Sequence, residues 1–245
     1  MKFLNKTLSC IFASTLLVSC AGNGQQLGDL ASVAKSALDG SGGGPLSTDD
    51  ITKGLKEALV TGSSAVVSQL GQTNGFNDDP TIRIPLPDSL LKAREFASNV
   101  GLAAPFDDLE LKLNRAAEEA TPKAKALFLN AIRDMSVDDA KGILQGPDDA
   151  ATEYFRGRTG TSLQAEMQPI VDQALSQVGA VSSFNDLLGK YNNIPFAPKV
   201  DADLTGYVVE ESSNGIFYYL AQEEKAIREN PLKRTSEILQ RVFGN

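Results

Sequence analysis

The sequence contains no histidine, and only two of its 245 residues are cysteine. A chain without histidine cannot build a Ser-His-Asp or Cys-His catalytic arrangement, a histidine-ligated zinc site, or the usual proton shuttle near neutral pH. It also lacks an EF-hand loop, a P-loop and a dinucleotide-binding fingerprint. Hydrolysis by paired carboxylates and oxygen-ligated calcium or magnesium sites remain possible. These absences favour a non-catalytic protein, so we expect no cofactor and assign no catalytic residue and no metal ligand.

Basic residues are in the minority. The chain has 23 lysines and arginines against 31 aspartates and glutamates, for a formal net charge of −8. Nucleic acids are bound through basic patches, and anionic lipid surfaces through clusters of basic residues. We therefore expect no nucleic-acid partner and no electrostatic attachment to a membrane.

The first residues have the pattern of a secretory signal peptide. Lys2 and Lys6 give the positive start, and the apolar run 8–18 is shorter than the roughly 20 residues that a helix needs to cross a bilayer. The run ends in Leu17-Val18-Ser19-Cys20, which resembles the lipobox of bacterial lipoproteins. The resemblance implies that residues 1–19 are removed and that Cys20 is acylated on its sulfur and on its new amino terminus.

Acylation would make Cys20 the membrane anchor. Each buried methylene group contributes ~0.8 kcal/mol, so several acyl chains on one residue give a stable attachment. Residue 21 is Ala, whereas Asp at this position usually retains lipoproteins of Gram-negative bacteria in the inner membrane. The resemblance therefore implies a location in the cell envelope, in the outer membrane and facing the periplasm. Cys10 would be lost with the signal peptide, which leaves no cysteine pair for a disulfide.

Residues 20–45 are predicted to be the acylated cysteine and a flexible tether. Gly40-Ser41-Gly42-Gly43-Gly44 breaks any helix that starts before it. A flexible chain of this length has a root-mean-square reach of roughly 25–30 Å. Such a tether would hold a domain away from the bilayer.

Residues 46–245 are predicted to form one helical domain. Ser47 followed by acidic residues is typical of a helix start, and apolar residues recur at helical spacing as far as Leu70. Residues 81–87, TIRIPLP, alternate with a period of two, and their prolines restrict them to an edge strand or an extended segment. Further helices are predicted at 88–100, 105–120, 122–135, 137–145, 147–157, 161–178, 180–192, 203–229 and 231–243. The expected fold class is all-α: a multi-helix bundle with one short extended or edge-strand segment, preceded by the signal peptide and the tether.

Segments of this domain resemble, in the same order, those of a bacterial lipoprotein family known as domain of unknown function 4197. They are LSTDDITKGLKEAL (46–59), IRIPLP (82–87), LELKLNRAAEEATPKAKALF (109–128), AIRDMSVDDAKGIL (131–144), DDAATEYFR (148–156), YNNIPF (191–196) and GIFYYLAQEEKAIRENPLKRTSEIL (215–239). The resemblance implies an exported, mostly helical protein with no established activity. It supplies no catalytic or binding residues.

A first polar cluster lies beside an apolar stripe of the helix predicted at 105–120, and it contains Asn114, Arg115, Glu118 and Glu119. Asn114 and Glu118 are one helical turn apart, so their side chains are neighbours. They could line a ligand cleft as an amide–carboxylate pair, or they could hold two helices together by hydrogen bonds. We favour the second interpretation.

A second polar cluster contains Glu223, Glu224 and Arg228. Glu224 and Arg228 have the i,i+4 spacing of a helical ion pair. The neighbouring apolar residues bring one of the glutamates to the edge of the core, where a buried acid needs a basic partner, and Arg115 and Arg228 are available. A ligand carboxylate held by arginine, or a metal held by the acids, is the functional alternative to this structural pairing.

Three smaller features are weaker candidates. Arg83 could bind an anion, although a solvent-facing charge that protects a strand edge is favoured. Tyr218 and Tyr219, beside Phe217, could line a pocket, although core packing is favoured. The acids at 148–149 are interpreted as the first turn of a helix and not as a metal site.

The sequence therefore favours a non-catalytic envelope lipoprotein whose domain binds a periplasmic protein, peptidoglycan or lipid. Two alternatives stay open: an acid-dependent hydrolase of envelope glycans, and a carrier of a small apolar ligand. Two carboxyl groups in one open cleft would favour the hydrolase, a large dry cavity would favour the carrier, and an exposed apolar patch would favour partner binding.

Overall fold

The computed structural model describes residues 47–99, 101–197, 200 and 202–229. The signal peptide, Cys20, the tether and the helix predicted at 231–243 lie outside the described residues. None of the described helices is both long enough and apolar enough to cross a membrane.

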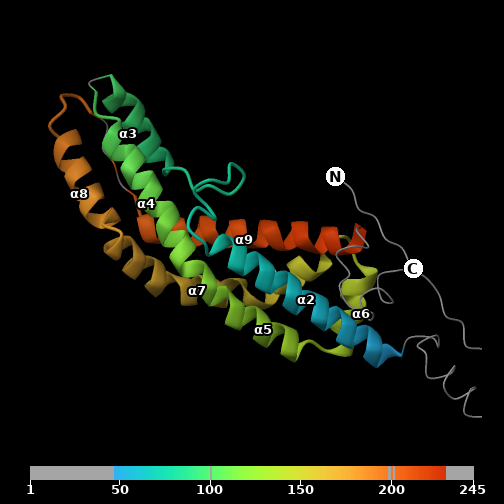
Figure 1. Cartoon of the computed structure of the whole chain (residues 1–245). Helices are drawn as coiled ribbons and strands as arrows, with labels where there is room; N and C mark the ends of the chain where they lie inside the picture. The colour runs from blue at the N-terminus through green and yellow to red at the C-terminus, as the bar shows by residue number, and fades with distance from the viewer. Residues whose placement is uncertain (1–46, 100, 198–199, 201, 230–245) are drawn as a thin grey trace, which may run out of the picture. The chain divides into compact units, whose positions relative to one another are not determined.

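The described part of the chain is all-α, as predicted, and contains no β-strand. Its elements are α2 (Thr48–Leu70), α3 (Asp88–Ser98), α4 (Ala104–Ala120), the 3-10 helix η1 (Thr121–Lys123), α5 (Ala124–Asp134), α6 (Val137–Gln145), α7 (Ala150–Gln177), α8 (Ala180–Tyr191) and α9 (Leu204–Glu229) (Figure 1).

The starts of two helices follow directly from local sequence. The Ser47 hydroxyl accepts a hydrogen bond from the Asp50 backbone N–H at 3.1 Å, and the Asp50 carboxylate accepts one from the Ser47 backbone N–H at 3.2 Å. Ser136 and Asp139 repeat this capping box at the start of α6, where the hydrogen bonds from Ser136 lower the pKa of Asp139. Each box pairs N–H groups that the first turn leaves without an intrahelical acceptor.

The prediction of two separate helices at 147–157 and 161–178 is wrong, because the single helix α7 runs unbroken from Ala150 to Gln177. Gly157, which is exposed, and Gly160, which is partly exposed, each cost ~1 kcal/mol relative to alanine in a helix. A stripe of buried residues every fourth position passes straight across them: Ala151, Phe155, Thr159, Leu163, Met167 and Val171. Packing of this stripe outweighs the low propensity of the glycines. The helix ends at Gln177, and Gly179, two residues further on, adopts a left-handed conformation with φ of 76°.

The longest helices, α7 and α9, pack against each other, and α2, α4, α5, α6 and α8 each contact at least one of them. α4 contacts both of them, while α2 lies beside α9 and contacts α5 and α6 (Figure 1). Phe128 lies between Phe155 and Phe217, with ring centroids 5.3 and 6.2 Å away. A second aromatic group places Tyr191 edge-on against Phe106, and burial raises the pKa of Tyr191.

Residues 71–87 connect α2 to α3 and contain the segment that was predicted to be an edge strand or extended. The extended alternative is the one observed. Ile82, Ile84 and Leu86 are buried and the residues between them are exposed, so the period of two is correct. Among the described residues no strand pairs with this segment, and we refer to residues 71–87 as the α2–α3 loop.

The α2–α3 loop approaches α9 at Gly215. A Cβ atom at this position would lie 2.8 Å from Phe76 Cε1 and 3.3 Å from Ile82 Cβ. The distance of 2.8 Å to Phe76 is shorter than real Cβ contacts. Phe76 is fully buried, so its side chain has no space to move aside. Glycine is therefore needed for the loop to lie against the helix.

We predict opposite effects for the same substitution at two helical glycines. Gly215→Ala should lower the free energy of unfolding by about 1–3 kcal/mol, because the methyl group overpacks the contact with Phe76. Gly157→Ala should raise it by up to about 1 kcal/mol, because nothing lies within 4 Å of its Cβ position. Urea unfolding of both variants and the wild type measures the difference, and a stabilised Gly215→Ala variant would contradict the close contact.

Candidate binding cleft and its supports

An open cleft of about 450 Å³ lies between the α2–α3 loop, the start of α7 and the middle of α9. Its polar side chains come from three distant parts of the sequence: Arg83, then Asp149, Glu153 and Arg156, then Glu211, Asn214 and Tyr218. The size is in the range of small-molecule binding sites, which is about 300–1,000 Å³. We refer to this hollow as the cleft.

Both guanidinium groups of the cleft are held by fixed partners. Arg83 Nη2 lies 2.9 Å from Glu110 Oε1, and the Glu110 side chain is only 13% exposed. Arg156 Nε lies 3.4 Å from Glu153 Oε1, and its guanidinium carbon is 4.5 Å from the centroid of the Phe217 ring. The arginines are therefore oriented before any ligand arrives, because an ion pair and an aromatic face restrict their rotamers.

Glu211 is the cleft carboxylate whose charge is least favoured. Partial burial raises its pKa, and the neighbouring charge of Glu210 raises it further. Asp149, at the start of α7, makes no side-chain cap to that helix. The cleft thus contains one acid with a raised pKa and two further carboxylates, those of Asp149 and Glu153.

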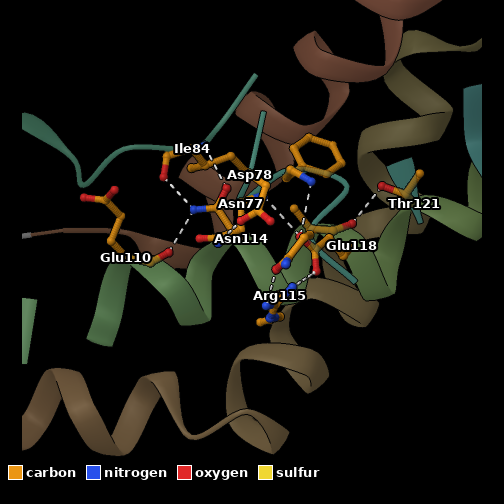
Figure 2. A network of polar contacts seen from close by, with 11 residues as sticks. Asn77, Asp78, Ile84, Glu110, Asn114, Arg115, Glu118 and Thr121 are labelled. Carbon is orange, nitrogen blue, oxygen red and sulfur yellow. Dashed lines mark hydrogen bonds and ion pairs between the residues drawn. The ribbon is translucent and has the colours of Figure 1, made fainter. Parts of the chain in front are cut away.

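Asn114 fixes one end of the α2–α3 loop to α4. Its Oδ1 accepts a hydrogen bond from the Ile84 backbone N–H at 2.9 Å, and its Nδ2 donates to the Ile84 carbonyl at 2.8 Å. Figure 2 shows this amide between Ile84 and Glu110, whose carbonyl it also contacts at 2.9 Å. Asn114 is fully buried, and its amide bonds to both the N–H and the carbonyl of Ile84. It thus makes the backbone hydrogen bonds that a neighbouring strand would otherwise make.

Glu118 fixes the other end of the loop. Its Oε1 accepts hydrogen bonds from the backbone N–H groups of Phe76 and Asn77, both at 3.2 Å, and its Oε2 accepts one from Arg115 at 2.6 Å (Figure 2). Arg115 also donates to the Asn74 side chain. The sequence suggested that this cluster holds two helices together, and the structure corrects the partner: the residues hold a loop to a helix. Glu119 is exposed and takes no part in these contacts.

The loop is also attached to α9. The Tyr219 hydroxyl donates a hydrogen bond to the Asp79 carboxylate. This bond raises the pKa of Tyr219 to about 12. Burial pushes the pKa of Asp79 upward, but hydrogen bonds from Tyr219 and Thr81 outweigh it and leave that pKa lowered. The Tyr218 ring meets the Tyr219 ring edge-on, with centroids 5.4 Å apart, so the same bond supports a side chain that lines the cleft.

Glu224 supports the opposite wall by capping α7 from α9. Its carboxylate accepts hydrogen bonds from the backbone N–H groups of Ala151 and Thr152, each at 2.9 Å, and from the Thr152 hydroxyl at 3.0 Å. The first N–H groups of a helix have no intrahelical acceptor, and a carboxylate there also faces the positive end of the helix dipole. A residue more than 70 positions away thus completes the start of α7.

Arg228 joins the same carboxylate to a third helix. Its Nη2 lies 2.9 Å from Glu224 Oε1 and also donates to the Ile143 carbonyl near the end of α6 at 2.8 Å. The side chains of Arg228 and Glu224 are only 14% and 8% exposed. Glu223 is half-buried, and together with Glu224 it lines a small cavity of about 20 Å³. Of the two basic partners considered for a buried acid, Arg228 binds Glu224 and Arg115 binds Glu118.

Neither sequence-derived cluster lines the cleft. Asn114, Arg115, Glu118, Glu224 and Arg228 lie behind its walls and position them. Arg83, Tyr218 and Asp149, which were weaker candidates, do line it.

Four further charged or amide residues of the cleft were not singled out from the sequence: Glu153, Arg156, Glu211 and Asn214. The i, i+3, i+7 spacing of Glu211, Asn214 and Tyr218 on one helix face is the signal that could have indicated the last two. Among the described residues, no group of three or more acids or cysteines is arranged to hold a metal ion.

The fold and the cleft define an all-α protein with an open polar cleft supported by buried polar side chains. Residues 45–244 match the family described as Protein of unknown function (DUF4197), and the chain belongs to this family. Searches of the curated proteins and of the solved structures found no match. The family description names no activity, so any functional assignment depends on the chemistry of the chain itself.

We predict that the buried polar residues behind the cleft are structural. Glu224→Ala or Arg228→Ala should lower the free energy of unfolding by about 3–5 kcal/mol, because each leaves the other charge buried and unpaired. Lys141→Ala is the control: its Nζ lies 3.9 Å from Asp138 in an exposed pair, and its loss should cost under about 1 kcal/mol.

Thermal and urea unfolding of these variants, together with Asn114→Ala and Glu118→Ala, would decide between the two roles. Destabilisation in all four supports a structural role. Variants that all melt at or above the wild-type temperature would instead make these residues a binding or catalytic site, since strained functional groups often stabilise a protein when removed.

Proposed function

We propose that this protein is an envelope lipoprotein, anchored in the outer membrane through acylated Cys20, whose helical domain binds a partner in the periplasm without catalysing a reaction. The observation that carries this proposal is the sequence Leu17-Val18-Ser19-Cys20 at the end of a short apolar run that begins after Lys6. A periplasmic protein, peptidoglycan and lipid are the candidate partners.

The hollows of the described part favour binding in the cleft over the other modes. The small cavities beside α9 and between α4 and α8 hold about 20 and 10 Å³, which is room for no more than a water molecule. A carrier of an apolar ligand needs a much larger enclosed space. The large apolar side chains that are exposed among the described residues come from five helices and one connecting segment: Val60, Leu111, Val137, Val181, Phe196 and Tyr218. Of these, Tyr218 lines the cleft.

We predict that Cys20→Ser abolishes incorporation of a labelled fatty acid and leaves the protein either unprocessed or released in soluble form. The reason is that the serine hydroxyl does not replace the thiol that receives the lipid. The measurement is metabolic labelling followed by fractionation of the envelope, and Cys10→Ser is the matched control that should behave as wild type. Unchanged labelling and membrane retention of Cys20→Ser would overturn the lipoprotein assignment.

A second candidate function is an acid-dependent hydrolase of envelope glycans. Glu211, whose pKa is raised, shares the cleft with the carboxylates of Asp149 and Glu153. Glycoside hydrolysis uses one protonated acid and one ionised carboxylate, and different environments must keep their pKa values apart. The cleft brings three carboxyl groups into one hollow, and Glu211, whose pKa is raised, is the candidate acid.

If the hydrolase assignment is correct, Glu211→Gln should abolish the release of soluble fragments from purified peptidoglycan, because an amide cannot deliver a proton. Glu166→Gln is the control, since its side chain is exposed and does not line the cleft. Wild-type activity should decline as the pH rises through the pKa of Glu211, because only the protonated form donates. Absence of fragment release by the wild-type protein rejects this candidate and leaves the non-catalytic proposal.

A further inference from the structure

We propose that the cleft binds a neutral, polyhydroxylated ligand, a short stretch of carbohydrate chain, between Arg83 and Asn214 with Tyr218 at its edge. This inference deepens the proposed function, because a sugar chain available to an envelope protein is the glycan of peptidoglycan. The ligand class itself follows from the side chains of the cleft.

The charges of the cleft disfavour an anionic ligand. A phosphate or carboxylate would share the cleft with the carboxylates of Asp149, Glu153 and Glu211. The start of α7 could otherwise attract an anion, since helix N-termini present free N–H groups. Glu224 already occupies the N–H groups of Ala151 and Thr152 at 2.9 Å, so these donors are not available.

The same cleft disfavours a simple cation. Arg83 and Arg156 lie on different walls, and Arg156 already pairs with Glu153, one of the three cleft carboxylates. Among the described residues, no group of three or more acids is arranged to hold a metal ion. Charges of both signs are therefore interspersed around the cleft. A neutral ligand is repelled neither by the carboxylates nor by the arginines.

The hydrogen-bonding groups match hydroxyls. Arginine only donates, an ionised carboxylate only accepts, and an asparagine amide does both. A hydroxyl can donate and accept at once, so neighbouring hydroxyls of a sugar ring can bond to donor-only and acceptor-only side chains that lie together. Because Arg83 is paired at 2.9 Å with Glu110, which is largely buried, little of its side-chain entropy is lost on binding.

Tyr218 provides an apolar surface at the edge of the cleft. It is 42% exposed although it is a large aromatic residue on a helix that is otherwise well packed. Its ring is held edge-on by Tyr219, which is in turn bonded to Asp79. A sugar ring has an apolar C–H face beside its hydroxyls, so an exposed ring next to polar groups suits both parts of it.

The size of the cleft fits this ligand. A volume of about 450 Å³ accommodates a few sugar units, and the cleft is open to solvent and not enclosed. An open cleft allows a chain to enter along its length, which a closed cavity would prevent.

The test uses full-length protein purified in detergent and isothermal titration with four probes: the β-1,4-linked tetramer of N-acetylglucosamine, maltotetraose, inorganic phosphate and spermidine. We expect the N-acetylglucosamine tetramer to bind and phosphate and spermidine not to bind. Binding of maltotetraose alone would uphold a carbohydrate site and overturn peptidoglycan as its source. Binding of phosphate or spermidine without either sugar, or of no probe, would overturn the inference.

Substitutions of cleft residues test whether the sugar binds in the cleft. Tyr218→Ala and Asn214→Ala should each weaken binding of the N-acetylglucosamine tetramer by about tenfold or more, as for the central aromatic and polar residues of a binding site. Tyr218→Phe keeps the ring and should stay within about twofold of the wild type, as should Asn130→Ala, an exposed asparagine outside the cleft. Equal affinity of Tyr218→Ala and wild type would overturn the site.

These experiments separate the inference from the proposed function. Sugar binding in solution does not depend on the membrane anchor, whereas acyl labelling and fractionation do not depend on the cleft. If the protein is acylated and located in the envelope but binds neither sugar, only the carbohydrate site is rejected. If the protein binds the sugar but is not acylated, only the lipid anchor is rejected.

Discussion

Glu224 lies where the start of α7 and the end of α6 meet α9, and its carboxylate satisfies backbone N–H groups that local sequence leaves without a cap. Arg228 neutralises that carboxylate and extends the contact to the carbonyl of Ile143. Three helices are thus fixed by two side chains, because a helix end buried without partners costs free energy for each unpaired group. The chain has no cysteine pair after Cys20, so such contacts and the apolar core must define its geometry.

The α2–α3 loop is also held by buried polar side chains that bond to its backbone. An irregular segment cannot pair its own backbone groups, and a buried one must therefore find side-chain partners. Asn114 and Glu118 provide them, one helical turn apart on α4, and Tyr219 holds the loop from the other side. Because this loop forms one wall of the cleft and the start of α7 forms another, the buried polar residues determine the shape of the site without lining it.

Much of the fold could be predicted from the sequence, and the parts that could not have physical causes. The capping boxes at Ser47 and Ser136 are local, so the first turns of α2 and α6 were predictable. Gly157 and Gly160 favoured a break in α7, but the buried stripe that overrides them depends on helices distant in the sequence. The spacing of Glu224 and Arg228 indicated an ion pair, whereas the cap on Ala151 and Thr152 joins residues more than 70 positions apart. The cleft itself was not predictable, because periodicity does not show which helix faces meet.

The sequence separation of the contacts around the cleft also has a consequence for folding. The bond between Tyr219 and Asp79 spans 140 residues, and that between Asn114 and Ile84 spans 30. Contacts with long separation form late because loop-closure entropy must be lost first. Two walls of the cleft come from residues 81–156, but the third wall comes from α9, which follows them in the chain. The cleft is therefore complete only once α9 has been synthesised, and a fragment that ends before Leu204 lacks Glu211, Asn214 and Tyr218 as well as the Glu224 cap on α7.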